Sequence, residues 1–129
     1  MESPAQNERE RRWASESGFF DNIRYDSEPL HTSVVERYLK CERPNFSDDY
    51  AFLAMGDLSG KTVLEIGCGD GWRSIVMALR GARVVSLDIS SKAVAAARAR
   101  AEQHGLLDRI QFHVTPIGFL PQARNLIIS

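Results

Sequence analysis

Cysteine and long apolar runs are both scarce in this sequence. Only Cys41 and Cys68 occur among 129 residues, and they form no CxxC pair, so no zinc site or other metal site is expected. No apolar run approaches the roughly 18 residues of a membrane span, so no membrane contact is expected. The polar, charged N-terminus lacks the apolar core of a secretory signal. We therefore expect a cytoplasmic protein with two reduced thiols, and a disulfide stays an alternative.

An excess of either charge is also missing. Lys plus Arg number 16 and Asp plus Glu number 17, which gives a net charge of -1. This balance offers no electrostatic basis for binding nucleic acid, so no nucleic-acid partner is expected and a small-molecule substrate is favoured. Apolar residues make up 43% of the chain, which is ordinary for a globular protein with a buried core.

The N-terminal part of the chain changes character along its length. Its first residues are charged and lack periodicity, which predicts disorder. Two short helical patterns follow. Ser33 and Glu36 form a capping box at the start of the first, and Ser47 and Gly56 are expected to begin and end the second. The expected divisions are a disordered polar tail over 1–17, an N-terminal helical segment over 18–57 and an α/β domain over 58–129.

After Gly60, apolar runs alternate with helical patterns. The stretches KTVLEI, ARVVSLD and RIQFHV are typical of buried strands, whereas WRSIVMALRG and SSKAVAAARARAEQHG are typical of helices that end at glycine. Two βαβ units in series predict a parallel sheet with strand order 3-2-1 and right-handed crossovers, so both crossover helices should cover one face. Residues 126–128 are a candidate fourth strand.

Three glycines, Gly67, Gly69 and Gly71, lie between the first strand and the helix that follows it, in the stretch VLEIGCGDG. Ligands of open parallel sheets bind beyond the carboxyl ends of the strands, where this loop should lie. Gly67 can adopt dihedral angles closed to other residues, and the other two glycines would let a ligand approach the main chain. The helix that starts near Trp72 favours a negatively charged ligand group at its N-terminus.

Asp88 stands at the carboxyl end of the second strand, 19 residues after Gly69. A carboxylate there can accept hydrogen bonds from the vicinal hydroxyls of a ribose, which predicts a nucleoside-containing ligand. In the dinucleotide fingerprint G-x-G-x-x-G the third glycine permits close packing, and here Trp72 has that position, which disfavours an NAD-dependent oxidoreductase. Glu65 at the end of the first strand suits a cationic amine and would repel a pyrophosphate.

These stretches resemble a known family. VLEIGCGDG resembles the first motif of class I S-adenosylmethionine-dependent methyltransferases, and VVSLDIS is similar to their second motif. The resemblance covers about residues 58–114 and implies a Rossmann-like α/β fold and S-adenosyl-L-methionine as cofactor. Upstream, FFDNIRYD resembles the segment before the first helix in small-molecule methyltransferases of the ubiquinone-biosynthesis type.

The resemblance also implies roles for particular residues. The three glycines of the loop would line the methionine portion of the cofactor, Glu65 would help hold its ammonium group, Asp88 would bind the ribose and Ile89 would lie along the adenine. The cofactor-binding residues implied in this way are Glu65, Gly67, Cys68, Gly69, Asp70, Gly71, Asp88 and Ile89.

The sequence departs from the family in two respects. The family has a seven-stranded sheet, whereas this chain offers three strands, or four, so its sheet is expected to be incomplete. Family members also carry an acidic residue shortly after the third strand, where this sequence has Thr115. No general base is identified. Two functions stay open: a methyltransferase in which the acceptor attacks the sulfonium methyl group in line, and a truncated or non-catalytic cofactor-binding module. An uncovered sheet face would favour self-association.

Several of these residues also have purely structural interpretations. Cys68 is expected to fit a crowded loop rather than to act as a nucleophile, because no activating partner is evident. Trp72 is expected to pack, and Asp88 has the alternative role of capping the next helix. The remaining candidates are assigned to the surface: His31, His104 and His113 as surface or edge residues, and Lys92, Arg98 and Arg100 as the solvated face of the long helix.

Overall fold

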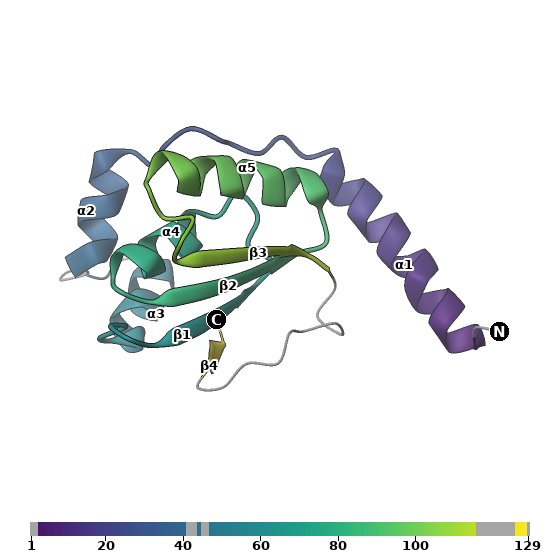
Figure 1. Ribbon diagram of the computed structural model, residues 1–129, viewed down its shortest axis with the longest axis horizontal. Helices are drawn as coiled ribbons and strands as arrows, with labels where there is room; N and C mark the ends of the chain where they lie inside the picture. The colour runs from purple at the N-terminus through teal and green to yellow at the C-terminus, as the bar shows by residue number, and fades with distance from the viewer. Residues whose placement is uncertain (1–2, 41–43, 45–46, 116–125, 129) are drawn as a thin grey trace.

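The computed structural model describes residues 3–40, 44, 47–115 and 126–128, and its centre is a parallel sheet (Figure 1). The strand order is β3-β2-β1-β4, so the predicted order 3-2-1 is confirmed, and the candidate fourth strand pairs with the outer edge of β1. The strands are β1 (Thr62–Ile66), β2 (Arg83–Asp88), β3 (Ile110–Val114) and β4 (Leu126–Ile128).

Two crossover helices, α4 (Trp72–Leu79) and α5 (Ser91–Gln103), lie on the same side of the sheet in Figure 1. Side chains of alternate strand residues meet them there, because successive residues of a strand point to opposite faces. Val63 and Val84 are fully buried with Ile75 of α4 and Ala97 of α5, and all four belong to one apolar cluster. This cluster is the main core, and it fixes the strand ends that carry the candidate site.

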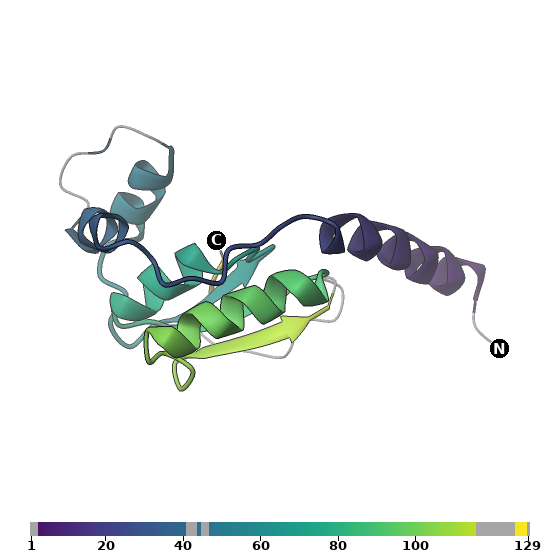
Figure 2. The same cartoon turned by 90° about the horizontal axis from the view of Figure 1, so that it is seen from above.

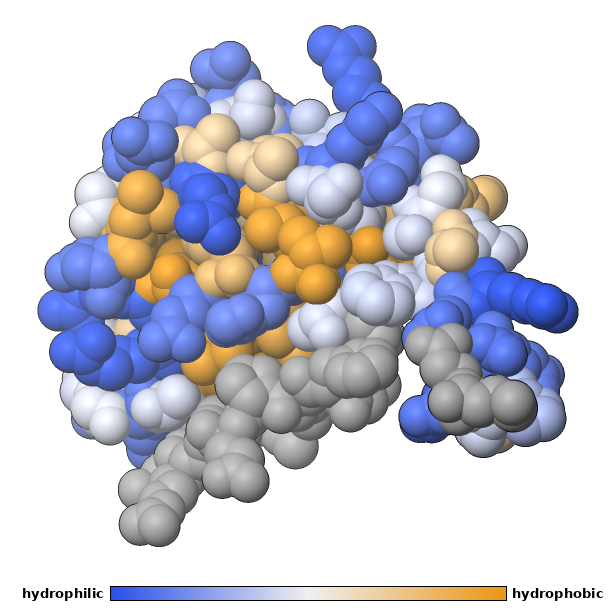
Figure 3. Space-filling model, turned by 45° about the vertical axis from the view of Figure 1, so that its right-hand side comes forward, coloured by the Kyte–Doolittle hydropathy of each residue, from blue (hydrophilic) through white to orange (hydrophobic). Residues whose placement is uncertain are grey.

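The opposite face of the sheet holds a smaller apolar cluster. Leu64, Val85 and Leu87 form it, and they are 2%, 8% and 1% exposed. The sequence predicted an uncovered apolar face, but these three side chains are buried. Ile66 continues the same face and is 36% exposed. Figure 3 shows one side of the molecule, where apolar side chains gather between hydrophilic ones.

The N-terminal residues form a helix, α1 (Pro4–Asp21), where the sequence predicted a disordered tail. Ser3 provides the physical reason, because its hydroxyl accepts the Gln6 N–H (3.2 Å) and the Gln6 side chain accepts the Ser3 N–H (2.7 Å). The helix buries no residue and projects away from the sheet (Figures 1 and 2). No helix within the described residues has the length and apolar character needed to cross a membrane.

Helices α2 (Thr32–Lys40) and α3 (Ser47–Met55) lie beside α4. The capping box predicted at Ser33 and Glu36 is wrong, since α2 already begins at Thr32 and the Ser33 N–H donates to Nδ1 of His31 (3.2 Å). Gly56 ends α3 with a φ of 63°, as predicted.

Residues 22–31, which we call the strap, join α1 to α2 and run along α5 (Figure 2). Gln103 donates to the Ser27 carbonyl (2.6 Å), and the Leu30 N–H donates to Nε2 of His104 (2.8 Å). Arg100 also contacts the strap and is only 4% exposed, so the prediction that it lies on a solvated helix face is wrong. His104 is half-buried. Its pKa is lowered mainly by this burial and, to a smaller extent, by the positive charge of the nearby Arg100.

Candidate functional site

The glycine loop turns sharply at the end of β1. Gly67 and Gly69 have φ values of 72° and 54°, in the left-handed region that favours glycine. The N–H groups of Gly67 and Cys68 both donate to the Leu87 carbonyl (2.8 and 3.0 Å), which holds the loop over the end of β2. A Cβ atom added at Gly67 or Gly69 would meet nothing within 4 Å. The main chain at these two glycines is therefore open to a ligand.

Gly71 has a different role from the one that the sequence predicted. Its φ is also positive, at 79°, but a Cβ atom there would lie 2.7 Å from the Cβ atom of Ala97. The missing side chain lets the start of α4 approach α5 and gives no access to a ligand. The close-packing position that sequence reasoning assigned to Trp72 is thus occupied by Gly71. Trp72 packs instead against Tyr38 and Phe52, with ring centroids 5.1 and 5.9 Å away, which confirms its predicted packing role.

Asp88 joins the glycine loop to the start of α5. One carboxylate oxygen accepts the Gly69 N–H and the other accepts the Ser90 N–H, both at 2.9 Å. The alternative that Asp88 caps α5 is wrong, because Ser90 is the N-cap and its hydroxyl accepts the Ala93 N–H (3.1 Å). An ionised carboxylate has about four acceptor positions, so two remain for the hydroxyls of a ligand.

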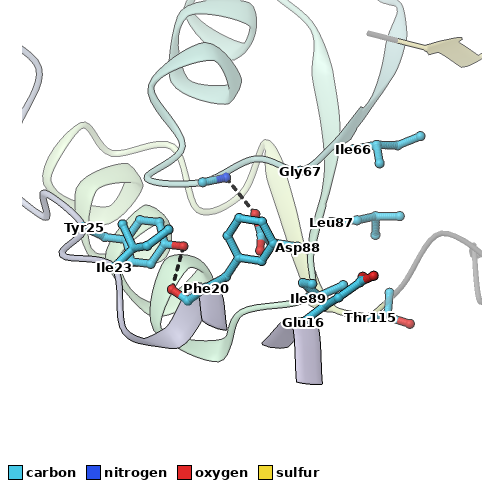
Figure 4. Close-up of a pocket in the computed structure, with 11 residues that line it drawn as sticks. Glu16, Phe20, Ile23, Tyr25, Ile66, Gly67, Leu87, Asp88, Ile89 and Thr115 are labelled. Atoms are coloured by element: carbon cyan, nitrogen blue, oxygen red, sulfur yellow. Dashed lines mark hydrogen bonds between the residues drawn. The ribbon is translucent and has the colours of Figure 1, made fainter. Parts of the chain in front are cut away.

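A cavity of about 580 Å³ opens beside Asp88 (Figure 4). Figure 4 shows Ile23 and Tyr25 on one side of Asp88 and Thr115 on the opposite side, with the Phe20 ring overlapping Asp88 in this view. Residues of α1, the strap and the strand ends therefore share its wall. Its lining consists of Glu16, Phe20, Ile23, Tyr25, Ile66, Gly67, Gly69, Leu87, Asp88, Ile89 and Thr115.

Sequence reasoning assigned no site residue to α1 or the strap. The four wall residues that they contribute lie in or near FFDNIRYD, whose resemblance to methyltransferases was the only signal pointing to them. Thr115, noted as the residue in place of an expected acid, does line the cavity.

Glu65 lies on the helix-covered face of β1 and borders a second cavity of about 380 Å³. Its carboxylate accepts a hydrogen bond from the Ser74 hydroxyl (2.6 Å), and Ser74 is also 2.6 Å from the Ser86 hydroxyl. Burial raises the pKa of Glu65 to about 7, against the opposing effect of the Ser74 hydrogen bond. The two cavities share Ile66 and Gly67 as wall residues.

The second cavity is bounded by α3 and α4. Arg73 donates to one carboxylate oxygen of Asp48 through Nε (3.1 Å) and Nη2 (3.0 Å), which ties the two helices together. Its apolar lining comes mainly from Ala51, Phe52, Met55 and Met77. The cavity therefore combines apolar walls with a buried carboxyl group and an ion pair.

Cys68 and Asp70 line neither cavity. Cys68 is a free thiol, 4% exposed, and burial raises its pKa well above the usual range, which confirms that it is no activated nucleophile. Cys41 lies outside the described residues. Asp70 points toward α5, where its carboxylate is 3.4 Å from Nη1 of Arg100.

The geometry agrees with comparisons to known proteins. Residues 57–129 match the methyltransferase domain family. The chain belongs to this family. A ubiquinone biosynthesis O-methyltransferase of Psychrobacter arcticus is 34% identical over 105 residues, which are 81% of this chain and 40% of that protein. A ribosomal protein L11 methyltransferase of Aeromonas hydrophila is 42% identical over 59 residues, 45% of this chain and 20% of that protein. This methyltransferase-family chain thus spans well under half the length of these curated relatives.

Solved methyltransferases share the fold. The magnesium protoporphyrin IX methyltransferase of Synechocystis PCC 6803, solved with bound SAH, superposes with a TM-score of 0.60 at 20% identity and covers 90% of this chain and 57% of that one. The geranyl diphosphate C-methyltransferase of Streptomyces coelicolor gives a TM-score of 0.55 at 16% identity. The match covers 84% of this chain and 49% of that one. At these identities the likeness concerns the fold, and it agrees with the predicted Rossmann-like parallel sheet.

Proposed function

We propose that this chain binds S-adenosyl-L-methionine across the two cavities. The adenine lies between Ile89 and Thr115, and the ribose hydroxyls donate to Asp88. The methionine portion passes over Gly67 toward the carboxyl group of Glu65. The observation that carries the proposal is the pair of open, left-handed glycines opposite an acid with free acceptor positions.

The residues present fit such a ligand. Apolar side chains in the larger cavity, Ile66, Leu87 and Ile89, suit a flat base, and Asp88 suits vicinal hydroxyls. Glu65 in the second cavity offers a carboxyl group, whose ionised form is the partner that an ammonium group needs and is favoured by that positive charge. Because Ile66 and Gly67 border both cavities, one elongated molecule can occupy them together.

We further propose methyl transfer to a small-molecule acceptor. The cofactor supplies an electrophilic methyl group on a sulfonium sulfur. The chain's own residues bind and orient the reactants and exclude water from them. The ubiquinone biosynthesis O-methyltransferase among the relatives supports an oxygen nucleophile on a small molecule, and the balanced charge of the chain agrees with it. A cytoplasmic location is part of this proposal.

A cofactor-binding module without transfer activity is the second candidate. We assign no general base among the described residues that line the two cavities. The two candidates agree on the cofactor and differ only in turnover.

Calorimetric titration with S-adenosylmethionine, S-adenosylhomocysteine and NAD tests the cofactor assignment. We expect binding of the first two and none of NAD. Binding of NAD alone would overturn the assignment. A methyl-transfer assay over phenols, carboxylic acids and amines then separates the two candidates, because the module would bind cofactor and give no methylated product.

A further inference from the structure

Arg100 of α5 contacts two parts of the chain that are far apart in sequence. Its Nε donates to the Glu28 carbonyl (2.6 Å), and its Nη2 lies 2.9 Å from the Asp26 carboxylate, both in the strap. Its Nη1 lies 3.4 Å from the carboxylate of Asp70 in the glycine loop. The Arg100 side chain is 5% exposed, so a single buried guanidinium joins the strap to the loop.

The strap forms part of the wall of the larger cavity. Ile23 and Tyr25 line it, and the Tyr25 hydroxyl donates to the Phe20 carbonyl (2.9 Å), which links the strap to the end of α1. The contacts of Arg100 begin one residue after Tyr25, at Asp26. The position of these wall residues therefore depends on Arg100, although Arg100 lines neither cavity.

A buried arginine side chain needs hydrogen-bonding and charged partners in fixed positions. A guanidinium stays charged at every pH of interest and presents a rigid fork of donors, so burial requires that its partners stay in place. If the strap moves away, Arg100 loses the Asp26 carboxylate and the Glu28 carbonyl and, of its ionic contacts within the described residues, keeps the one to Asp70. A buried charge with too few partners is costly, so the strap and the loop favour each other's ordered positions.

We propose that Arg100 is a positioning residue that couples the strap to the glycine loop. Ligand binding at the loop then orders the strap, and an ordered strap completes the wall around the ligand. This inference rests on the proposed cofactor site for its effect on affinity, but the coupling itself can be measured without any ligand.

The first experiment compares Arg100→Met with Arg98→Met. Arg98 is exposed on the same helix, with its guanidinium over the Phe112 ring, so the control removes an equal charge and leaves the strap contacts in place. We expect Arg100→Met to speed amide exchange over residues 26–31 and to weaken S-adenosylhomocysteine binding about tenfold. Arg98→Met should change neither. Arg100→Lys, which keeps the charge without the fork, should recover part of the affinity.

A milder variant keeps the test decisive if Arg100→Met does not fold. Asp26 is 61% exposed and lines neither cavity, so Asp26→Asn should fold normally and weaken binding roughly threefold. In the absence of ligand, Asp26→Asn should also speed exchange in the glycine loop, residues 67–70. Folded variants that melt earlier but bind S-adenosylhomocysteine as tightly as the unmodified chain would overturn the proposal, since Arg100 would then be structural only.

The failure of this inference differs from the failure of the proposed function. If the unmodified chain binds no S-adenosylhomocysteine, the proposed function fails, and the exchange data still decide whether strap and loop are coupled. If the chain binds but exchange in the loop does not respond to Asp26→Asn, the coupling is wrong and the cofactor site stands.

Discussion

At the scale of single residues, Glu65 couples the site to pH. Its pKa is about 7 in the folded chain, against an ordinary value of 4.5, because burial disfavours the charged form. The folded state therefore binds more protons than the unfolded state between these two values. It follows that the free energy of unfolding decreases as pH rises through this window, by up to about 1.4 kcal/mol per pH unit.

We predict that Glu65→Gln removes this slope. Denaturant unfolding at several pH values from 4.5 to 7.5 should show the stability of the unmodified chain falling relative to the variant. His104, whose pKa is lowered, contributes an opposite slope below its ordinary value of 6.5, but it is present in both chains and cancels in the difference. Parallel stability curves for the two chains would contradict the raised pKa.

We predict that the same substitution, glycine to alanine, destabilises the fold more at Gly71 than at Gly69. Gly69→Ala places a side chain in open space at positive φ, which costs about 1–2 kcal/mol of backbone strain. Gly71→Ala adds the contact at 2.7 Å with Ala97, so overpacking should cost about 1–3 kcal/mol more. Urea unfolding of both variants measures the difference. Equal destabilisation would show that α4 and α5 can separate at no cost.

Asp88 should matter for both binding and folding. Asp88→Ala removes the proposed ribose acceptor, and hydrogen bonds to a charged group are each worth about 1.5–3 kcal/mol, so affinity should fall about tenfold to a hundredfold for each bond lost. It also leaves the Gly69 and Ser90 N–H groups without this acceptor. Asp57→Ala is the matched control, because Asp57 accepts the Ser59 N–H in a turn outside both cavities. Unchanged affinity in folded Asp88→Ala would remove Asp88 from the site.

At the scale of secondary-structure elements, the sheet and its crossover helices follow from local patterns. Strands β1 to β3 are short apolar runs separated by helical stretches, and successive strands joined by short crossovers are favoured as neighbours in the sheet, as they are here. Gly67 and Asp88 could be placed at adjacent strand ends for the same reason. Whether each glycine faces a ligand or another helix could not be predicted from the sequence, because it depends on tertiary neighbours such as Ala97, which lies against Gly71.

The strap and α1 were missed for a different reason. Ser27, Glu28 and Leu30 of the strap contact α5 through main-chain groups, and such groups leave no mark in the sequence. Arg100 follows Ala93 and Ala97 at the spacing of the buried face of α5, so the helical period did place it there, but a charged side chain is seldom buried unless it is paired. The helix start at Ser3 was readable in principle, because Gln6 stands three residues later, where a capping box requires it.

Helix α3 should depend on the buried side chain of Phe52. Phe52 is 1% exposed, and its ring packs against Tyr38 and Trp72 at centroid distances of 5.0 and 5.9 Å. We predict that Phe52→Ala lowers the free energy of unfolding by about 3–5 kcal/mol. Tyr50→Ala, on the same helix but 57% exposed, should change it by less than about 0.5 kcal/mol. Similar losses from both variants in thermal and urea unfolding would mean that α3 is held by its helical propensity and not by packing.

At the scale of the whole molecule, the two faces of the sheet differ in how helices cover them. Helices α4 and α5 cover one face of the sheet, and the wall of the larger cavity is completed from the N-terminal side by α1 and the strap. On the opposite face Leu64, Val85 and Leu87 are buried and Ile66 is 36% exposed, and parallel sheets are normally covered on both faces by helices. The edge of β1 is paired by β4 over only three residues, and β3 forms the other edge.

This asymmetry predicts that the 129-residue chain self-associates through its second sheet face. Ile66 lies on that face, where it also lines both cavities, and is 36% exposed, so Ile66→Thr should weaken association. Leu79 on α4 has almost the same exposure, 37%, on the other side of the sheet, and Leu79→Thr is the matched control. Size-exclusion chromatography with light scattering over a hundredfold range of concentration measures the mass. A monomer at every concentration, or equal effects of the two variants, would show that the second face is not the surface that brings copies together.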